Sequence, residues 1–186
     1  MGAWNVLSLR EDDHQSLLSS ELKRLDIGIA EISEVRRPDY GEIMVGGYTS
    51  YWSGRSDGYH TQGVAVAVSN KLTPMIIEVT PVNERLMRLR IHHSLGVISR
   101  VSVYAPTEAS DFTVKEVFHA TLESVVDQCP RRDTLPVLGD FYALTGTDRE
   151  TCVGPHGSGT MNQNSTKFLD SKSHGLRVAG SWFQCP

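Results

Sequence analysis

Four polar side chains of this 186-residue chain belong to apolar, strand-like segments: Asn5 lies within the first segment, and Glu34, Tyr104 and Asp140 stand at the ends of later ones. Asp140 follows the apolar run 135–139, and Glu34 follows a similar run at 27–33. An Asp after a strand is by itself more typical of a turn or a cap. The carboxyl ends of strands are, however, where α/β sheets bind ligands. The recurrence of the pattern at several strands therefore favours a chemical role.

An amide, two carboxylates and a phenol gathered at strand ends suit metal-assisted attack on a phosphodiester. Mg²⁺ (or Mn²⁺) prefers carboxylate oxygens and would polarise a phosphoryl oxygen, while a second carboxylate can activate water. A phenol or an amide can hold the phosphate or the water. Simpler alternatives stay open: Glu34 and Asp140 as capping acids, Asn5 as a polar strand residue, and Tyr104 as a packed aromatic.

The first 34 residues predict a β–α–β order. Residues 3–9 alternate as a strand does. Asp12 with Gln15 resembles a capping box, and it opens a short helix that places leucines 18, 22 and 25 on one face. Residues 27–33 then read as a buried strand that ends at Glu34. This order favours an α/β fold.

Further strands are predicted at 42–45, 48–52, 64–68, 75–79, 85–91, 97–104 and before Asp140. A second helix follows the capping box Thr113-x-x-Glu116. Beyond it we predict a polar loop at 145–165, a short helix around 167–169 and a last strand at 176–183. Two packed sheets flanked by helices fit this tally. No segment resembles a linker, so one domain over 1–186 is expected.

Four arginines lie on or beside the predicted strands: Arg85, Arg88, Arg90 and Arg100. They could line a phosphate-binding face. Arginine on the exposed side of a strand is more often solvated, and we expect that here.

The overall composition sets limits on partners and location. The net charge is −4 and the pI is about 6.0, so DNA binding would need a local basic face. No apolar stretch reaches the length of a membrane span, and the N-terminus lacks a signal-peptide core. The three cysteines are far apart and odd in number, which suits reduced thiols. We expect an intracellular protein, nuclear or cytoplasmic and not secreted, without a membrane or a small-molecule cofactor.

Four ordered motifs carry a family resemblance: Trp-Asn-Val-x-x-Leu at 4–9, Ile-Ser-Glu-Val-Arg at 32–36, Val-Tyr-Ala-Pro at 103–106 and Leu-Gly-Asp-Phe at 138–141. With them the chain resembles the endonuclease/exonuclease/phosphatase superfamily. More closely, it is similar to the apurinic-type endonuclease domain of non-LTR (LINE) retrotransposons, including the craniofacial development protein 2-like proteins derived from them.

The resemblance implies a four-layered α/β sandwich and a Mg²⁺-dependent nuclease that nicks DNA, with a double-stranded partner. It implies that Glu34 is the principal metal ligand with Asn5 beside it. It further implies that Asp140 orients or deprotonates the attacking water and that Tyr104 contacts the phosphate.

Two departures from the family pattern bear on activity. Tyr142 stands where the family motif Gly-Asp-Phe-Asn has an amide, and a phenol cannot supply the amide's paired donor and acceptor. The family also ends with an Asp-containing strand and a Ser-Asp-His strand, and this sequence stops before both. We therefore expect impaired or absent activity, and self-association through an exposed sheet edge. The alternatives are a non-catalytic relic that binds nucleic acid or protein, and a phosphatase or phospholipase of the same superfamily.

Overall fold

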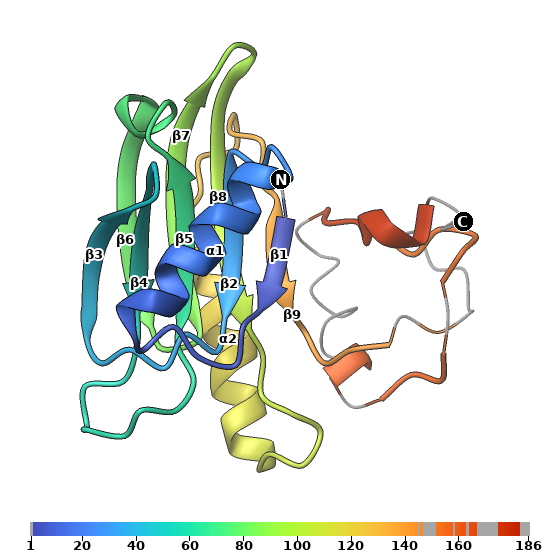
Figure 1. The fold of residues 1–186 in the computed structure, drawn as a ribbon. Coiled ribbons are helices and arrows are strands. Elements are labelled where there is room, and N and C mark those ends of the chain that lie inside the picture. Colours follow the sequence, from blue (N-terminus) through green and yellow to red (C-terminus); the bar gives the residue numbers. More distant parts are fainter. Residues whose placement is uncertain are drawn as a thin grey trace. The chain divides into compact units, whose positions relative to one another are not determined.

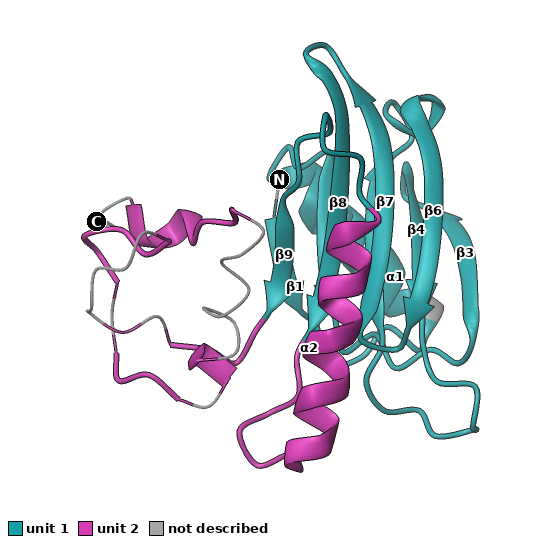
Figure 2. Cartoon of the chain, turned by 180° about the vertical axis from the view of Figure 1, so that it is seen from behind, with its two compact units in different colours: residues 1–104, 129–140 teal, residues 105–128, 141–186 magenta. Residues whose placement is uncertain are grey.

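The computed structural model describes residues 2–144, 146, 152–157, 159–162, 164–166 and 175–182. The chain divides into two compact units, one made of residues 1–104 and 129–140 and the other of residues 105–128 and 141–186 (Figure 2). A single domain over 1–186 remains a prediction.

The first unit contains one α-helix and two sheets among its described residues (Figure 1). Its elements, in chain order, are β1 (Gly2–Asn5), α1 (Asp12–Arg24), β2 (Ile29–Ser33), β3 (Tyr40–Val45), β4 (Tyr48–Ser53), β5 (Val64–Ser69), the 3-10 helix η1 (Thr73–Met75), β6 (Ile76–Asn83), β7 (Leu86–His93), β8 (Gly96–Tyr104) and β9 (Val137–Asp140). The strand orders are β1-β2-β5-β4-β3 and β6-β7-β8-β9. Both sheets are mixed, because β1–β2 and β8–β9 are parallel pairs and the other pairs are antiparallel.

Helix α1 covers one face of the five-stranded sheet. Leu22 and Leu18 lie one turn apart and pack against Ala30 and Ile32 of β2. Two basic residues, at 23 and 24, occupy the last turn, where they complement the helix dipole. Burial of this apolar stripe, more than local propensity, stabilises the helix.

The other face of that sheet packs on the four-stranded sheet, since strands β2, β4 and β5 contact strands of both sheets. A buried ion pair crosses the interface: Arg100 of β8 donates from Nε to Oε1 of Glu31 in β2 at 2.7 Å. Each side chain is 1% exposed. Burial raises the pKa of Glu31, in spite of the opposing effect of Arg100. The pair fixes one sheet relative to the other.

Gly139 allows β9 to lie against β8. Its φ is 136°, and a Cβ at this position would come within 2.0 Å of the carbonyl oxygen of Val103, its register partner. Any other residue would push the two strands apart.

The second unit contains helix α2 (Phe112–Asp127) and the 3-10 helix η3 (Ala179–Trp182). The apolar stripe predicted for the second helix is present, and it buries Phe118, Leu122 and Val125. An isolated bridge joins Val153 to Val178. Among the described residues of both units, no helix is long and apolar enough to cross a membrane.

The α/β class, the two packed sheets and the flanking helix α1 are as predicted. Two local predictions are wrong. Neither capping box forms, because α1 begins after Glu11 and α2 after Asp111, without a side-chain cap. Gln15 donates instead to the hydroxyl of Ser50 in the sheet.

The last strand, predicted at 176–183, is also wrong where it is described. Only the single bridge at Val178 forms, and 179–182 turn as a 3-10 helix. The short helix predicted around 167–169 lies outside the described residues. Self-association through a sheet edge remains a prediction.

Candidate active site

Two pairs of parallel strands deliver the predicted site residues. Asn5 is the last residue of β1, and Glu34 directly follows β2, its parallel neighbour. Tyr104 and Asp140 are the last residues of β8 and β9, and they are register partners in a parallel pair. Each parallel pair therefore brings two polar side chains to the same end of its own sheet.

The amide of Asn5 joins the two acids. Its Nδ2 donates to Oε1 of Glu34 at 2.8 Å and to Oδ2 of Asp140 at 3.3 Å. The carboxylates come from different sheets, so one small side chain connects the two halves of the site. The amide oxygen accepts the backbone N–H of Leu7 at 3.2 Å, which fixes the direction in which the nitrogen points. Asn5 is exposed, and both acids are partly exposed, so the group is open to a ligand.

Glu34 is held in its ionised form. The hydrogen bond from Asn5 is the main cause that lowers its pKa, with smaller effects in the same direction from Arg36 and from a hydrogen bond with Tyr104. Partial burial opposes these effects without reversing them. The site thus offers a charged carboxylate over the whole neutral pH range.

The backbone around Glu34 is unusual. Glu34 and Arg36 have φ of 60° and 55°, a left-handed conformation that costs a non-glycine residue about 1–3 kcal/mol. Two main-chain hydrogen bonds maintain it: Val35 N–H to Gly63 O at 3.2 Å and Arg36 N–H to Gln62 O at 2.8 Å. Val35 between them is fully buried. Such strain is typical of functional sites, and nothing in the local sequence announces it.

Arg85 is half-buried and lies against Tyr104, so the expectation that it is simply solvated is wrong. Its guanidinium is 5.5 Å from the centroid of the phenol ring, and its Nη1 donates to the Tyr104 carbonyl at 3.2 Å. The backbone of Tyr104 donates in turn to Arg85 O at 2.9 Å. Tyr104 is therefore both packed and polar in its contacts, and the ring is buried.

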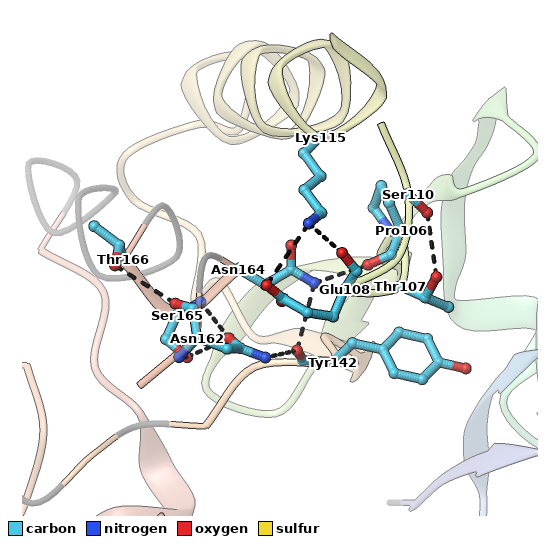
Figure 3. A network of polar contacts seen from close by, with 10 residues as sticks. All are labelled: Pro106, Thr107, Glu108, Ser110, Lys115, Tyr142, Asn162, Asn164, Ser165 and Thr166. Carbon is cyan, nitrogen blue, oxygen red and sulfur yellow. Dashed lines mark hydrogen bonds and ion pairs between the residues drawn. The ribbon is translucent and has the colours of Figure 1, made fainter. Parts of the chain in front are cut away.

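Tyr142 belongs to the second unit. Its backbone has φ of 46°, and its carbonyl oxygen accepts hydrogen bonds from the amides of Asn162 at 2.8 Å and Asn164 at 3.4 Å (Figure 3). The same Asn164 amide donates to Pro106 O at 2.8 Å. The network in Figure 3 therefore ties the segment after Asp140 to the segment after Tyr104.

The residues of the first unit suit one hard divalent cation. Glu34 and Asp140 supply carboxylate oxygens, the ligands that Mg²⁺ and Mn²⁺ prefer, and water would complete the coordination. The described residues contain no group of three or more His, Cys, Asp or Glu side chains able to hold a metal. Asn5 presents its nitrogen to the acids in this arrangement, so its role as a ligand remains a prediction, as do the assigned roles of the other site residues.

The other three arginines are not simply solvated. Arg100 is buried against Glu31, so the expectation of an exposed position is wrong for it. The last six residues of its strand are all buried, and Arg100 points towards Glu31 of the other sheet, opposite Leu89 in register. Arg88 pairs with Glu78 at 3.0 Å, and Arg90 pairs with buried Asp133 at 2.9 Å. A charged residue inside the apolar run 27–33, Glu31, was the signal in the sequence for a buried partner.

Comparison with known proteins gives relatives in both sequence and structure. No protein-family model matches the chain. Craniofacial development protein 2 of Tragulus javanicus is 27% identical over 188 residues, covering 100% of this chain and 32% of that protein. The protein of the same name from Bos taurus is 26% identical, again over the whole chain, and 31% of it is covered. The chain thus spans about a third of the length of these curated relatives.

Solved structures share the fold. The AP endonuclease LMAP from Leishmania major superposes with a TM-score of 0.66 and 13% sequence identity, over 92% of this chain and 65% of that one. The endonuclease domain of TRAS1, a telomere-specific non-LTR retrotransposon, gives a TM-score of 0.60 and 18% identity, over 92% and 69%. These likenesses concern the fold with its two packed sheets, and the chain therefore has the fold of the endonuclease/exonuclease/phosphatase superfamily.

Proposed function

We propose that this chain is a divalent-metal-dependent endonuclease domain of retrotransposon origin that hydrolyses a phosphodiester bond of double-stranded DNA. The observation that carries the proposal is the Asn5 amide, which is hydrogen-bonded to two carboxylates from different sheets. The names of two fold neighbours, an AP endonuclease and the endonuclease domain of a non-LTR retrotransposon, support it.

Each residue has a distinct part in this proposal. Glu34 would hold Mg²⁺ or Mn²⁺, because its pKa is kept low and its oxygens are hard donors. The bound cation would supply charge neutralisation at the phosphate. Asp140 would orient the attacking water or take its proton, and Asn5 would keep the two acids at a fixed separation. Tyr104, oriented by Arg85, would donate from its hydroxyl to a phosphate oxygen.

We expect the reaction to be very slow in this chain, because Tyr142 replaces the asparagine of the family motif. Its φ of 46° lies in the left-handed region, which asparagine tolerates and a bulky aromatic residue disfavours. A tyrosine therefore brings both a missing amide and backbone strain to the residue two positions after Asp140. An intracellular location, nuclear or cytoplasmic, goes with a DNA substrate.

The direct test is nicking of supercoiled plasmid in Mg²⁺, which is measured as the conversion of supercoiled DNA to the open circle. Weak nicking should disappear with EDTA and in Glu34→Ala. It should persist in Glu21→Ala, which removes an exposed acid on α1. Equal nicking by wild type and Glu34→Ala would refute the assignment. Salt-sensitive DNA binding without any nicking would favour the non-catalytic alternative, and vigorous nicking that needs Glu34 would show that Tyr142 does not impair the site.

A further inference from the structure

The second oxygen of Glu34 is taken by an arginine. Nη2 of Arg36 lies 2.9 Å from Oε2, while Oε1 accepts the Asn5 amide. Glu34 has an exposed side-chain fraction of 12%, and Arg36 has 43%. The carboxylate that the proposed function assigns to a divalent cation thus already has a cationic partner from the same loop.

The two side chains of this pair differ in their exposure to solvent, although their backbones are held alike. The backbone of Glu34 and Arg36 is fixed by the hydrogen bonds to Gln62 and Gly63 and by the burial of Val35. The guanidinium stands at the end of a long stem with nearly half of the side chain in solvent. It can leave the carboxylate by side-chain rotation alone, without any change in the strained backbone.

We propose that Arg36 is a displaceable counter-ion: it pairs with Glu34 until a divalent cation binds there, and its guanidinium then binds a phosphate of the nucleic-acid backbone. This proposal rests on the proposed function. The guanidinium of Arg36 is 43% exposed, and solvent around one partner weakens an ion pair, so a hard divalent cation can replace the guanidinium on Glu34. Two cations on one carboxylate repel each other, whereas a guanidinium matches the oxygens of a phosphate in a bidentate manner. The metal would thus turn an internal ion pair into a substrate contact.

The first arm of the test measures the affinity of the chain for Mn²⁺ in the absence of DNA, from the electron paramagnetic resonance signal of the free ion. Arg36→Gln removes the charge and keeps a side chain of similar length, and it should bind Mn²⁺ about two- to five-fold more tightly than wild type. Arg36→Lys retains the charge and should stay close to wild type. Arg24→Gln, which breaks an exposed pair on α1 at 2.8 Å, is the matched control and should leave the affinity unchanged.

The second arm measures the binding of a duplex oligonucleotide by fluorescence anisotropy, with Ca²⁺ in place of Mg²⁺. In Ca²⁺, Arg36→Gln should bind the duplex more weakly, and the slope of log affinity against log salt should fall by about 1. In EDTA the same variant should match wild type, because Arg36 is then paired with Glu34. The opposite signs of the two effects, tighter metal and weaker DNA, are not expected from a residue that only supports the loop.

Failure of the inference can be told from failure of the proposed function. If Glu34→Gln leaves Mn²⁺ binding unchanged, Glu34 is no metal ligand and the proposed function fails with it. If Glu34→Gln abolishes binding but Arg36→Gln and Arg24→Gln behave alike, the function stands and the counter-ion role is wrong. An equal loss of duplex binding in Ca²⁺ and EDTA would also overturn it.

Discussion

Replacing Arg100 with methionine should destabilise the chain severely. The substitution leaves the carboxylate of Glu31, which is 1% exposed, without its partner between the two sheets. Removing one member of a buried ion pair typically costs about 3–5 kcal/mol, against a total stability of about 5–15 kcal/mol for a domain. With a urea m-value of about 2 kcal/mol per M, the midpoint of unfolding should fall by roughly 1.5–2.5 M.

The charge itself, rather than lost packing, should cause most of this effect. The double variant Glu31→Leu with Arg100→Met removes both charges, and it should recover most of the stability, because well-packed apolar pairs match buried ion pairs. Circular dichroism during urea titration measures the stability of three variants: Arg100→Met, Glu31→Leu and the double variant. Arg24→Met, at an exposed ion pair on α1, serves as the control and should not move the midpoint measurably.

The dependence on pH gives a second check. Burial raises the pKa of Glu31 above its ordinary value of 4.5. Between pH 4.5 and the raised pKa, the folded chain keeps a proton on Glu31 that the unfolded chain has lost. This contribution to stability is therefore full below pH 4.5 and disappears as the pH rises through the folded pKa, above which Glu31 is ionised and paired with Arg100. The deficit of Arg100→Met should accordingly shrink in acid. Single variants within about 0.5 kcal/mol of wild type, or a double variant whose loss equals the sum of the singles, would refute the reasoning.

Three further predictions concern the site and the strand that carries it. Tyr142→Asn should raise the free energy of unfolding by about 0.5–1 kcal/mol, because asparagine tolerates φ of 46°, and should raise plasmid nicking at least ~10-fold; an unchanged rate would show that the amide is dispensable. Asn5→Ala removes the main cause that lowers the Glu34 pKa. In wild type, ionised Glu34 contributes stability that is present above pH 4.5 and is lost as the pH falls through its lowered pKa. In Asn5→Ala this contribution should be lost at a higher pH. Binding of Mn²⁺, measured from pH 3 to 6, should likewise be lost at a higher pH. Gly139→Ala should cost about 3 kcal/mol or more by thermal or urea unfolding, since its Cβ would lie 2.0 Å from a carbonyl oxygen of β8; Gly96→Ala, at nearly the same φ of 137° but in open space, should cost clearly less, and equal losses would exclude the clash as the cause.

The sequence alone was enough to place Glu34 and Asp140 at strand ends, because apolar runs that stop at an acid are a local pattern. It also predicted the strands at 42–45 and 48–52, which pair through a turn at Gly46 and Gly47, both with positive φ. Helix starts were harder. The two predicted capping boxes did not form, because the helices begin after Glu11 and Asp111. At the first helix, Gln15 makes a tertiary hydrogen bond to Ser50 in place of the local one.

What the sequence could not show is which faces of the two sheets meet. Arg88 of β7 alternates with apolar residues and is partly exposed, whereas Arg100 of β8 stands in a run, residues 99–104, that is buried throughout. A strand that is buried at every position has no polar side, so its sequence does not tell which of its residues face the other sheet. The sequence gives no sign of the left-handed conformation of Glu34 either. That conformation depends on main-chain hydrogen bonds to Gln62 and Gly63, which lie in another loop.

The buried ion pair and the candidate site are parts of one arrangement. Glu31 precedes Glu34 by three residues along β2 and its exit, and Arg100 precedes Tyr104 by four along β8. Burying Glu31 in β2 or Arg100 in β8 without a partner would be costly, so the two strands must meet where these side chains pair. A shift of one sheet by a single residue would separate the pair, and it would move Glu34 away from Tyr104 and Asp140 at the same time. The cost of burying two charges thereby sets the register in which one amide can reach both carboxylates, so the site depends on the core as much as on its own four side chains.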